Sequence, residues 1–201
     1  MRETRQPFYV SSGDAPAKQK IVIAALNLFV LDGLCETSIR DIAKASGFSN
    51  PALFKHFPSK DALASYLFER CYLELCNLIT RAIRSGDTFA MKHRAVIGAY
   101  VAALDQDRNA VLYVQDNLRR FWPKMQVAMR KHSIIGEVRG LLELGRKEGV
   151  VTATLDVGLL TVAWIGTLQQ FARAQYFGEF KLPSSVLATT LEDLLTRMVK
   201  A

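Results

Sequence analysis

The chain contains 201 residues, of which 50% are hydrophobic and 22% are charged, a balance that supplies a packed core and excludes a disordered chain. No apolar run approaches the roughly 18 residues of a membrane span, so we expect no membrane association. Two N-terminal arginines lack an apolar run behind them, which argues against a secretory signal. Three cysteines at no disulfide-framework spacing favour reduced thiols and a cytoplasmic protein.

The formal net charge is +7, which favours polyanionic partners. The basic residues form two groups, one before residue 61 and a larger one between Lys92 and Lys147. The first group accompanies the motif described below. For the second we expect solvated helix faces, with attraction of an anionic effector as the alternative.

Residues 1–15 show no periodicity and contain proline and glycine, so we expect a flexible arm there. Pro16 suits the first turn of a helix, where its missing N–H costs nothing. Apolar residues recur at helical spacing from Ile21 onward, and Gly33 ends this first helix.

Two short helices follow in close succession. Thr37 is the predicted N-cap of the second helix, which continues to about Ala45 without a capping box because Arg40 occupies its third position. Ser49 is the predicted cap of a third, very short helix with Pro51 in its first turn.

The rest of the chain is helical by pattern. Pro58 ends the third helix, and Ser59 caps a fourth from Lys60 to about Arg84. Further helices are expected at Thr88–Gln106, Arg108–Phe121, Pro123–Lys147, Asp156–Tyr176 and Ser184–Val199. Val150–Leu155 is the nearest candidate for a strand, and we expect it to form a loop. The sequence therefore predicts an all-α chain.

The second and third helices carry the features of a helix-turn-helix. Two helices that meet at a steep angle need a small residue where they cross, and Ala43 provides one. Gly47 follows four positions later, where a tight turn favours a residue that tolerates positive φ. Apolar residues occupy the positions that a three-helix core requires, namely Ile39, Ile42, Phe48, Leu53 and Phe57.

The same segment resembles the N-terminal domain of the tetracycline-repressor (TetR) family. The resemblance rests on Ala25-Leu-Asn-Leu-Phe29, Asp32-Gly33, Thr37-Ser-Ile-Arg-Asp-Ile-Ala43, Gly47-Phe-Ser and Leu53-Phe-Lys-His-Phe-Pro-Ser-Lys60. It implies a helix-turn-helix DNA-binding domain over residues 16–75, after the arm at 1–15. A larger helical domain for effector binding and dimerisation is implied over residues 76–201.

The resemblance also implies which residues contact operator DNA: Thr37, Ser38, Ser49, Asn50, Ala52, Phe54, Lys55, His56 and Lys60. Thr37, His56 and Lys60 would meet phosphates, whereas Asn50 would offer its amide to adenine and Lys55 would reach a guanine edge or a phosphate. Two departures from the family pattern stand out. Phe54 replaces the usual tyrosine and lacks its hydroxyl, and the pair Asn50-Pro51 begins the reading helix.

Arg2 and Arg5 belong to the predicted arm, and insertion of this arm into an adjacent minor groove is one interpretation. A simple unstructured tail is the other.

For the C-terminal portion, the resemblance implies dimerisation through the last two helices. The residues that suit this role are Leu159, Val162, Ala163, Gly166, Leu187, Leu191, Leu194 and Leu195, and an internal core explains several of them equally well. A small-molecule effector site is expected among aromatic and polar-tipped residues of the middle helices. These residues are Tyr100, Tyr113, Asn117, Phe121, Met125, Met129 and Trp164, for which core packing is again the alternative.

No enzyme pattern is present. The histidines His56, His93 and His132 match no nucleophile or zincin motif, and we expect His93 and His132 to be surface residues. Cys71 and Cys76, five apart on a helix, suggest no metal site, and no cofactor is expected. The predicted function is a ligand-responsive repressor that binds a palindromic operator as a homodimer. The alternatives are a helical interaction module and a transcriptional activator.

Overall fold

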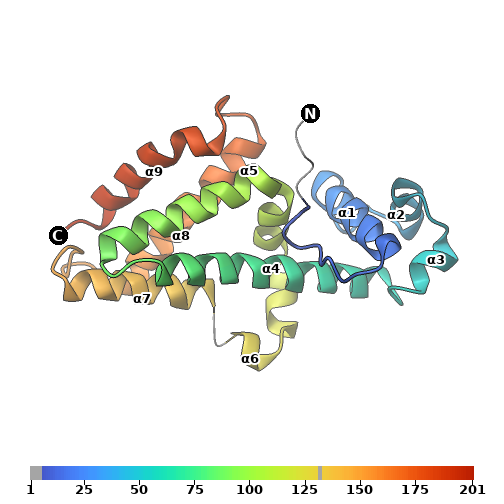
Figure 1. Cartoon of the computed structure of the whole chain (residues 1–201), viewed down its shortest axis with the longest axis horizontal. Coiled ribbons are helices and arrows are strands. Elements are labelled where there is room, and N and C mark those ends of the chain that lie inside the picture. Colours follow the sequence, from blue (N-terminus) through green and yellow to red (C-terminus); the bar gives the residue numbers. More distant parts are fainter. Residues whose placement is uncertain (1–5, 131–132) are drawn as a thin grey trace. The chain divides into compact units, whose positions relative to one another are not determined.

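The computed structural model describes residues 6–130 and 133–201, and these residues are helical apart from turns, loops and one isolated antiparallel bridge between Val151 and Lys200 (Figure 1). None of the helices that it describes combines the length and the apolar character that crossing a membrane would require. The chain divides into two compact units. One contains the described part of Met1–Glu74 together with Asn109–Met125, and the other contains Leu75–Arg108 and Gln126–Ala201.

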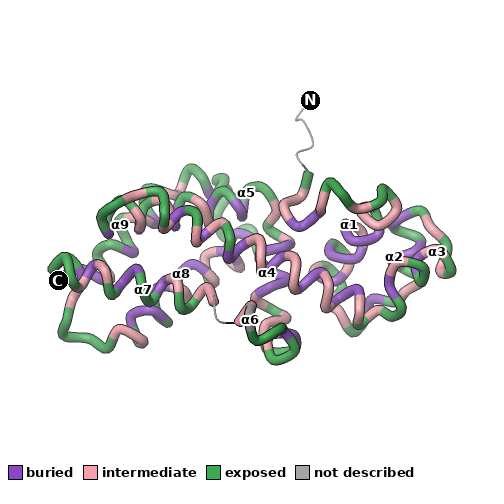
Figure 2. The backbone as a smooth tube through the Cα atoms, turned by 60° about the horizontal axis from the view of Figure 1, so that its bottom comes forward, coloured by how far each residue is buried: buried purple, intermediate pink, exposed green. Residues whose placement is uncertain are grey.

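The first unit begins with α1 (Pro16–Leu31), α2 (Ile39–Ser46) and α3 (Asn50–Phe54). Pro16 stands in the first turn of α1, as predicted, and Gly33 adopts a positive φ just beyond its end. Figure 2 shows buried positions recurring along α1 and α4 between intermediate and exposed ones. Ile42 and Leu53, one from each helix of the helix-turn-helix, are fully buried in this core.

The cap of α2 differs from the prediction. Ser38, not Thr37, is the N-cap, and its hydroxyl accepts from the backbone N–H of Asp41 while the Asp41 carboxylate accepts from the N–H of Ser38. Helix α2 therefore has a capping box with aspartate at the third position. The prediction was wrong by one residue because it placed the third position at Arg40 and did not consider the serine that follows Thr37.

The turn and the third helix form as expected. Gly47 has a φ of 77°, in the left-handed region that favours glycine, and ends α2. Ser49 caps α3 through a hydrogen bond from the N–H of Ala52, and Pro51 lies in the first turn. Three local signals thus set the direction in which α3 leaves α2.

Helix α4 (Lys60–Arg84) and helix α5 (Phe89–Phe121) each contribute to both units. The hydroxyl of Ser59 caps α4 by accepting from the N–H of Ala62. Helix α5 is interrupted at Asp107, whose φ of −157° and ψ of 77° are not helical. This interruption confirms the predicted break between residues 106 and 108.

The second half of α5 completes the core of the first unit. Tyr113 is buried, stacks on Phe29 of α1, and donates its hydroxyl to the carbonyl of Ala64 on α4. Phe121 packs against Phe68 of α4 with its ring tilted, and the ring centroids are 5.5 Å apart. The core of the first unit is thus built from α1 to α4 together with the second half of α5.

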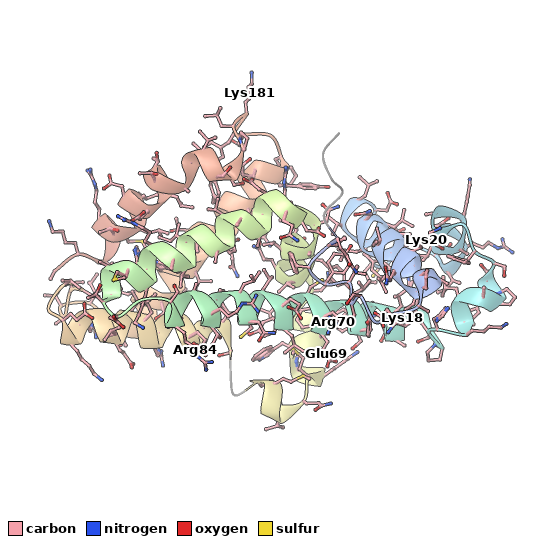
Figure 3. All side chains as sticks on the ribbon, viewed as in Figure 1. Lys18, Lys20, Glu69, Arg70, Arg84 and Lys181 are labelled. Carbon is pink, nitrogen blue, oxygen red and sulfur yellow. The ribbon has the colours of Figure 1, made fainter. Side chains whose placement is uncertain are left out.

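The expectation of a flexible arm fails for the described residues 6–15. Tyr9 is only 2% exposed, and its carbonyl accepts a hydrogen bond from Arg70 of α4 (Figure 3). Asp14 pairs with Lys18 at 2.8 Å and accepts from the hydroxyl of Tyr66. The turn residues that suggested disorder instead fold this segment onto α1 and α4. Arg2 and Arg5 lie outside the described residues.

The region predicted as one helix over Pro123–Lys147 consists of three pieces. These are a 3₁₀ turn at Trp122–Lys124, α6 (Val127–Arg130) and α7 (Ile134–Lys147). Ser133 caps α7 by accepting from the N–H of Gly136, which starts a new helix where continuity was expected. His132 and Lys131 lie outside the described residues.

The second unit contains the end of α4, the first part of α5, α6, α7, α8 (Val157–Tyr176) and α9 (Ser184–Val199). Both helix starts agree with the prediction to within a residue, since Asp156 caps α8 and α9 begins after Pro183. The first two N–H groups of α9 donate to the Asp105 carboxylate, each at 2.9 Å. Arg108 donates to the carbonyl of Gln175 near the end of α8. Residues on either side of the interruption of α5 therefore hydrogen-bond to α8 and to α9.

His93 is part of the core of this unit, so the prediction of a surface residue was wrong. Its side chain is 2% exposed, stacks on Phe89, and accepts a hydrogen bond from the indole N–H of Trp164 at 3.0 Å. Burial lowers the pKa of His93 from 6.5 to about 4, against a weaker opposing effect of Glu192. The imidazole is therefore neutral at physiological pH.

Candidate nucleic-acid interface

Helix α3 and the turn after it combine exposed polar residues with buried apolar ones. Leu53 and Phe57 are buried in the core of the first unit, whereas Phe54 is 48% exposed and Lys55 is exposed. Ser49 is exposed as well, and Asn50, Ala52 and His56 are half-buried. Helix α3 and the turn that follows it thus present an amide, an ammonium and an imidazole group, with the aromatic ring of Phe54 between them in the sequence.

Helix α2 adds basic residues that the sequence analysis did not select. Arg40 and Lys44 are four residues apart and both exposed, so they lie on one side of α2. Their signal in the sequence was a pair of basic residues four positions apart in the first helix of the motif. Asp41 lies between them, and hydrogen bonds from the Ser38 side chain and backbone lower the pKa of its carboxyl group. Ser38 therefore supports the start of α2.

Lys60, at the start of α4, hydrogen-bonds to the backbone of the α1–α2 loop. Its Nζ donates to the carbonyl oxygens of Leu34 at 2.8 Å, Cys35 at 3.2 Å and Thr37 at 2.8 Å. An ammonium group has three protons, so these carbonyls occupy its whole donor capacity. Lys60 thereby joins the α1–α2 loop to α4, and a phosphate would have to displace one of these bonds.

Thr37 has a similar role. Its side chain is buried, and its hydroxyl donates to the carbonyls of Gly33 at 2.8 Å and Leu28 at 3.3 Å. The hydroxyl thus closes the loop after α1. A direct contact between this group and a phosphate does not fit its burial.

An acidic group balances part of the basic charge of the first unit. Asp61 pairs with Arg120 at 2.6 Å and with Lys124 at 3.6 Å. The hydrogen bond from Arg120 holds the pKa of this carboxyl group below its usual value. Both cations are therefore partly neutralised, whereas Arg40, Lys44 and Lys55 form no ion pair within the described residues.

The predicted effector residues divide between the two units. Tyr113, Asn117, Phe121 and Met125 belong to the first unit, and Tyr100, Met129 and Trp164 belong to the second. Their polar tips already have protein partners, since Tyr113 donates to Ala64, Tyr100 to Leu168 and Trp164 to His93. Most of these residues fill the two cores, which was the alternative that the pattern left open.

The predicted dimer residues separate into two groups. Leu159, Val162 and Leu194 are 62%, 65% and 54% exposed, and Ala163 is exposed as well. Gly166 and Leu187 are half-buried. Leu191 and Leu195 are buried in the core of the second unit, so these two cannot meet a partner from this face. They were misassigned because a core leucine and an interface leucine recur at the same helical spacing.

The geometry of the first unit defines a class of protein. It contains a helix-turn-helix whose second helix is capped, packs on the core through its apolar side and exposes polar residues. This arrangement is that of a DNA-binding module. The family model for bacterial regulatory proteins of the tetR family matches residues 21–67, which run from α1 into α4.

Three known proteins are similar over most of their length. The HTH-type transcriptional repressor KstR2 of Rhodococcus jostii is 26% identical over 164 residues, covering 78% of each chain. The solved structure of ketosteroid transcriptional regulator KstR2 of Mycobacterium tuberculosis has a TM-score of 0.84 at 20% identity, covering 98% of this chain and 100% of that one. FadR of Bacillus subtilis, solved with stearoyl-CoA, has a TM-score of 0.67 at 21% identity, covering 90% and 98%.

The chain thus contains a TetR-family DNA-binding domain over residues 21–67 and is similar over most of its length to transcriptional regulators.

Proposed function

We propose that the protein is a homodimeric repressor that binds a palindromic operator through α3 of each subunit and releases it when a small molecule binds the second unit. The observation that carries this proposal is the exposed face of α3. The amide of Asn50 in α3, and the ammonium and imidazole groups of Lys55 and His56 in the turn after it, have free hydrogen-bonding capacity, while Leu53 and Phe57 anchor this segment in the core.

The residues of this face divide into two roles. Asn50 and Lys55 suit contacts with base edges, because an amide pairs with adenine and an ammonium group with guanine. Arg40 and Lys44 of α2, together with His56, suit contacts with the phosphate backbone. Thr37 and Lys60 act indirectly, since their hydrogen bonds set the position of the α1–α2 loop. Ser38 and Ser49 cap the two helices.

The apolar face of α8 and α9 supports the dimer. Leu159, Val162 and Leu194 expose large apolar side chains on two neighbouring helices, and Ala163 with Gly166 would allow close approach. A twofold axis through this face brings two recognition helices to one operator, so that palindromic DNA matches the symmetry of the protein.

Relatives suggest which effector to test first. FadR of Bacillus subtilis was solved with stearoyl-CoA, so an acyl-CoA thioester is the first candidate class for this chain. In the proposed mechanism the ligand favours a conformation that binds DNA less tightly, and the free energy available for release equals the difference in its affinity for the two conformations.

Gel-shift titration tests the proposal. DNA that flanks the native gene should give a specific complex with the purified protein, and its affinity should fall steeply as salt rises, because phosphate contacts release counterions. Stearoyl-CoA, with coenzyme A alone as control, tests release. Absence of a specific complex at moderate salt with protein in excess would contradict operator binding. That outcome would favour the alternative of a helical interaction module.

Lys55→Ala sharpens the test. Loss of one charged contact should weaken operator binding by about tenfold, without a change in thermal stability because the side chain is exposed. The matched control is Lys20→Ala, which removes an exposed lysine from α1 (Figure 3) and should change the affinity by no more than about twofold. Equal effects of the two variants would remove Lys55 from the interface.

A further inference from the structure

A cavity of about 920 Å³ lies in the second unit, and none of the residues predicted to bind an effector lines it, although Trp164 contacts the lining residue His93. The start of α5, the turn between α7 and α8, and the end of α9 surround it. Phe89, Met91 and Val150 supply apolar wall. The rim is charged and contains Arg94, Glu148, Glu192, Asp193, Arg197 and Lys200. This combination of apolar wall and charged rim is typical of a small-molecule site.

A buried hydrogen-bond donor reaches the wall of this cavity. His93 lines it although its side chain is 98% buried by the surrounding protein, and its Nε2 accepts from the indole N–H of Trp164 at 3.0 Å. An indole nitrogen can only donate, so Nε2 carries no proton and the neutral imidazole holds its proton on Nδ1. Within the described residues this N–H has no acceptor, so it points to a ligand with an oxygen acceptor.

The charges at the rim favour an anion. Each acidic side chain of the rim already has a partner: Glu148 accepts from the N–H of Phe89, Glu192 from Arg94, and Asp193 from Arg197. The cations retain donors, because Arg94 uses only Nε and Arg197 only one Nη in these pairs. Lys200 forms no ion pair with any described residue. Both arginine side chains are largely exposed and free to turn toward a bound group.

We propose that this cavity binds a small oxo-carboxylate with an apolar body, such as an aromatic keto acid. The carboxylate accepts from Arg94, Arg197 and Lys200, and the keto oxygen accepts from Nδ1–H of His93. The apolar body lies against Phe89, Met91 and Val150. A neutral ligand would leave the rim donors unused, and a ligand without a second oxygen would leave the buried imidazole N–H without an acceptor.

Isothermal titration calorimetry of the full-length protein tests the site with two probes that differ only in the ketone, 3-benzoylpropionate and 4-phenylbutyrate. Both should bind saturably with one molecule per chain, and the ketone should improve affinity by about fivefold, the effect of one neutral hydrogen bond. The paired variant Arg94→Gln with Arg197→Gln should weaken both probes by about tenfold or more. Arg84→Gln, at an exposed arginine outside the cavity (Figure 3), is the matched control and should leave both affinities within about twofold.

His93→Phe separates the role of the imidazole from the integrity of the fold. The variant should bind 4-phenylbutyrate as the parent does, which shows that the cavity persists, and should lose the preference for 3-benzoylpropionate. If that variant does not fold, His93→Gln retains both a donor and an acceptor and should preserve the preference.

Three results overturn the proposal: no saturable binding to the parent at millimolar probe, unchanged affinities in the paired arginine variant, or a ketone preference that survives His93→Phe. No DNA is present in these titrations, so their outcome is independent of operator binding.

Discussion

The two units expose surfaces of opposite chemistry. In the first unit, the outer sides of α2 and α3 display Arg40, Lys44 and Lys55. In the second unit, α8 and α9 display Leu159, Val162 and Leu194. Charged side chains are well hydrated, so a basic surface needs no partner. Hydration of an apolar surface is unfavourable, so such a surface favours burial against a partner.

This difference separates how the two surfaces are expected to bind. The α2–α3 surface should bind through charge, so salt weakens it and single exposed residues can be removed without loss of stability. The α8–α9 surface should bind through burial of apolar area, so salt has little effect and a buried charge disrupts it. The predictions below test this contrast, from the largest expected effect to the smallest.

The largest effect is expected from Val162→Glu on α8. Two copies of this carboxylate would be buried in a twofold interface, which should weaken dimerisation by at least about a hundredfold. Analytical ultracentrifugation should show a folded monomer. Ile135→Glu on α7 is the matched control, because Ile135 is 52% exposed but lies outside the α8–α9 face. A dimer that survives Val162→Glu would place the interface elsewhere.

The second effect concerns the stability of the second unit at acidic pH. The pKa of His93 is about 4 in the folded protein and 6.5 when exposed, so below pH 6.5 the unfolded chain binds a proton that the folded chain does not. The free energy of unfolding should therefore be highest above pH 6.5 and should fall by about 3 kcal/mol as the pH approaches 4.

Urea unfolding between pH 7.5 and 4.5 measures this dependence, and the His93→Gln variant should show a shallower slope. An equally steep slope in that variant would assign the pH dependence to other groups.

The third effect concerns Lys60. Lys60→Met leaves three carbonyl oxygens of the α1–α2 loop without their donor and should lower the free energy of unfolding of the first unit by about 2 kcal/mol. Lys55→Met is the control and should leave stability unchanged. If Lys60→Met weakens operator binding at unaltered stability, Lys60 contacts the phosphate backbone after all.

The smallest expected effect is an increase in operator affinity. Phe54→Tyr adds a hydroxyl at an exposed position of α3 that can donate to a phosphate, and operator binding should tighten by about tenfold or less. Gel-shift titration at two salt concentrations measures it. Weaker binding would show that the Phe54 ring makes an apolar contact that a hydroxyl disrupts.

The helix-turn-helix was predictable because its signals are local. Pro16, Gly33, Gly47 and Ser49 each fix the backbone within a few residues, and the structure places all four where those signals indicate. The break at Asp107 also lies where the sequence predicted the boundary between two helices.

Errors arose where distant residues decide the outcome. The turn-rich segment 6–15 was assigned to a flexible arm because the sequence does not show that Tyr9 packs into the first unit or that Asp14 meets Tyr66. His93 was assigned to the surface because the sequence does not show that the indole of Trp164 on α8 donates a hydrogen bond to it. Leu191 and Leu195 were assigned to an interface because spacing alone does not separate core from contact surface.

The sequence by itself determined the all-α class, the order of the DNA-binding helices and the polar face of α3, because caps, turns and periodicity act over a few residues. Only the tertiary structure decided that Lys60 and Thr37 hold a loop, that the aromatic residues divide between two cores, and that a cavity forms at the end of α9. Each of these outcomes joins residues far apart in the chain, and their contacts depend on packing that no local pattern encodes.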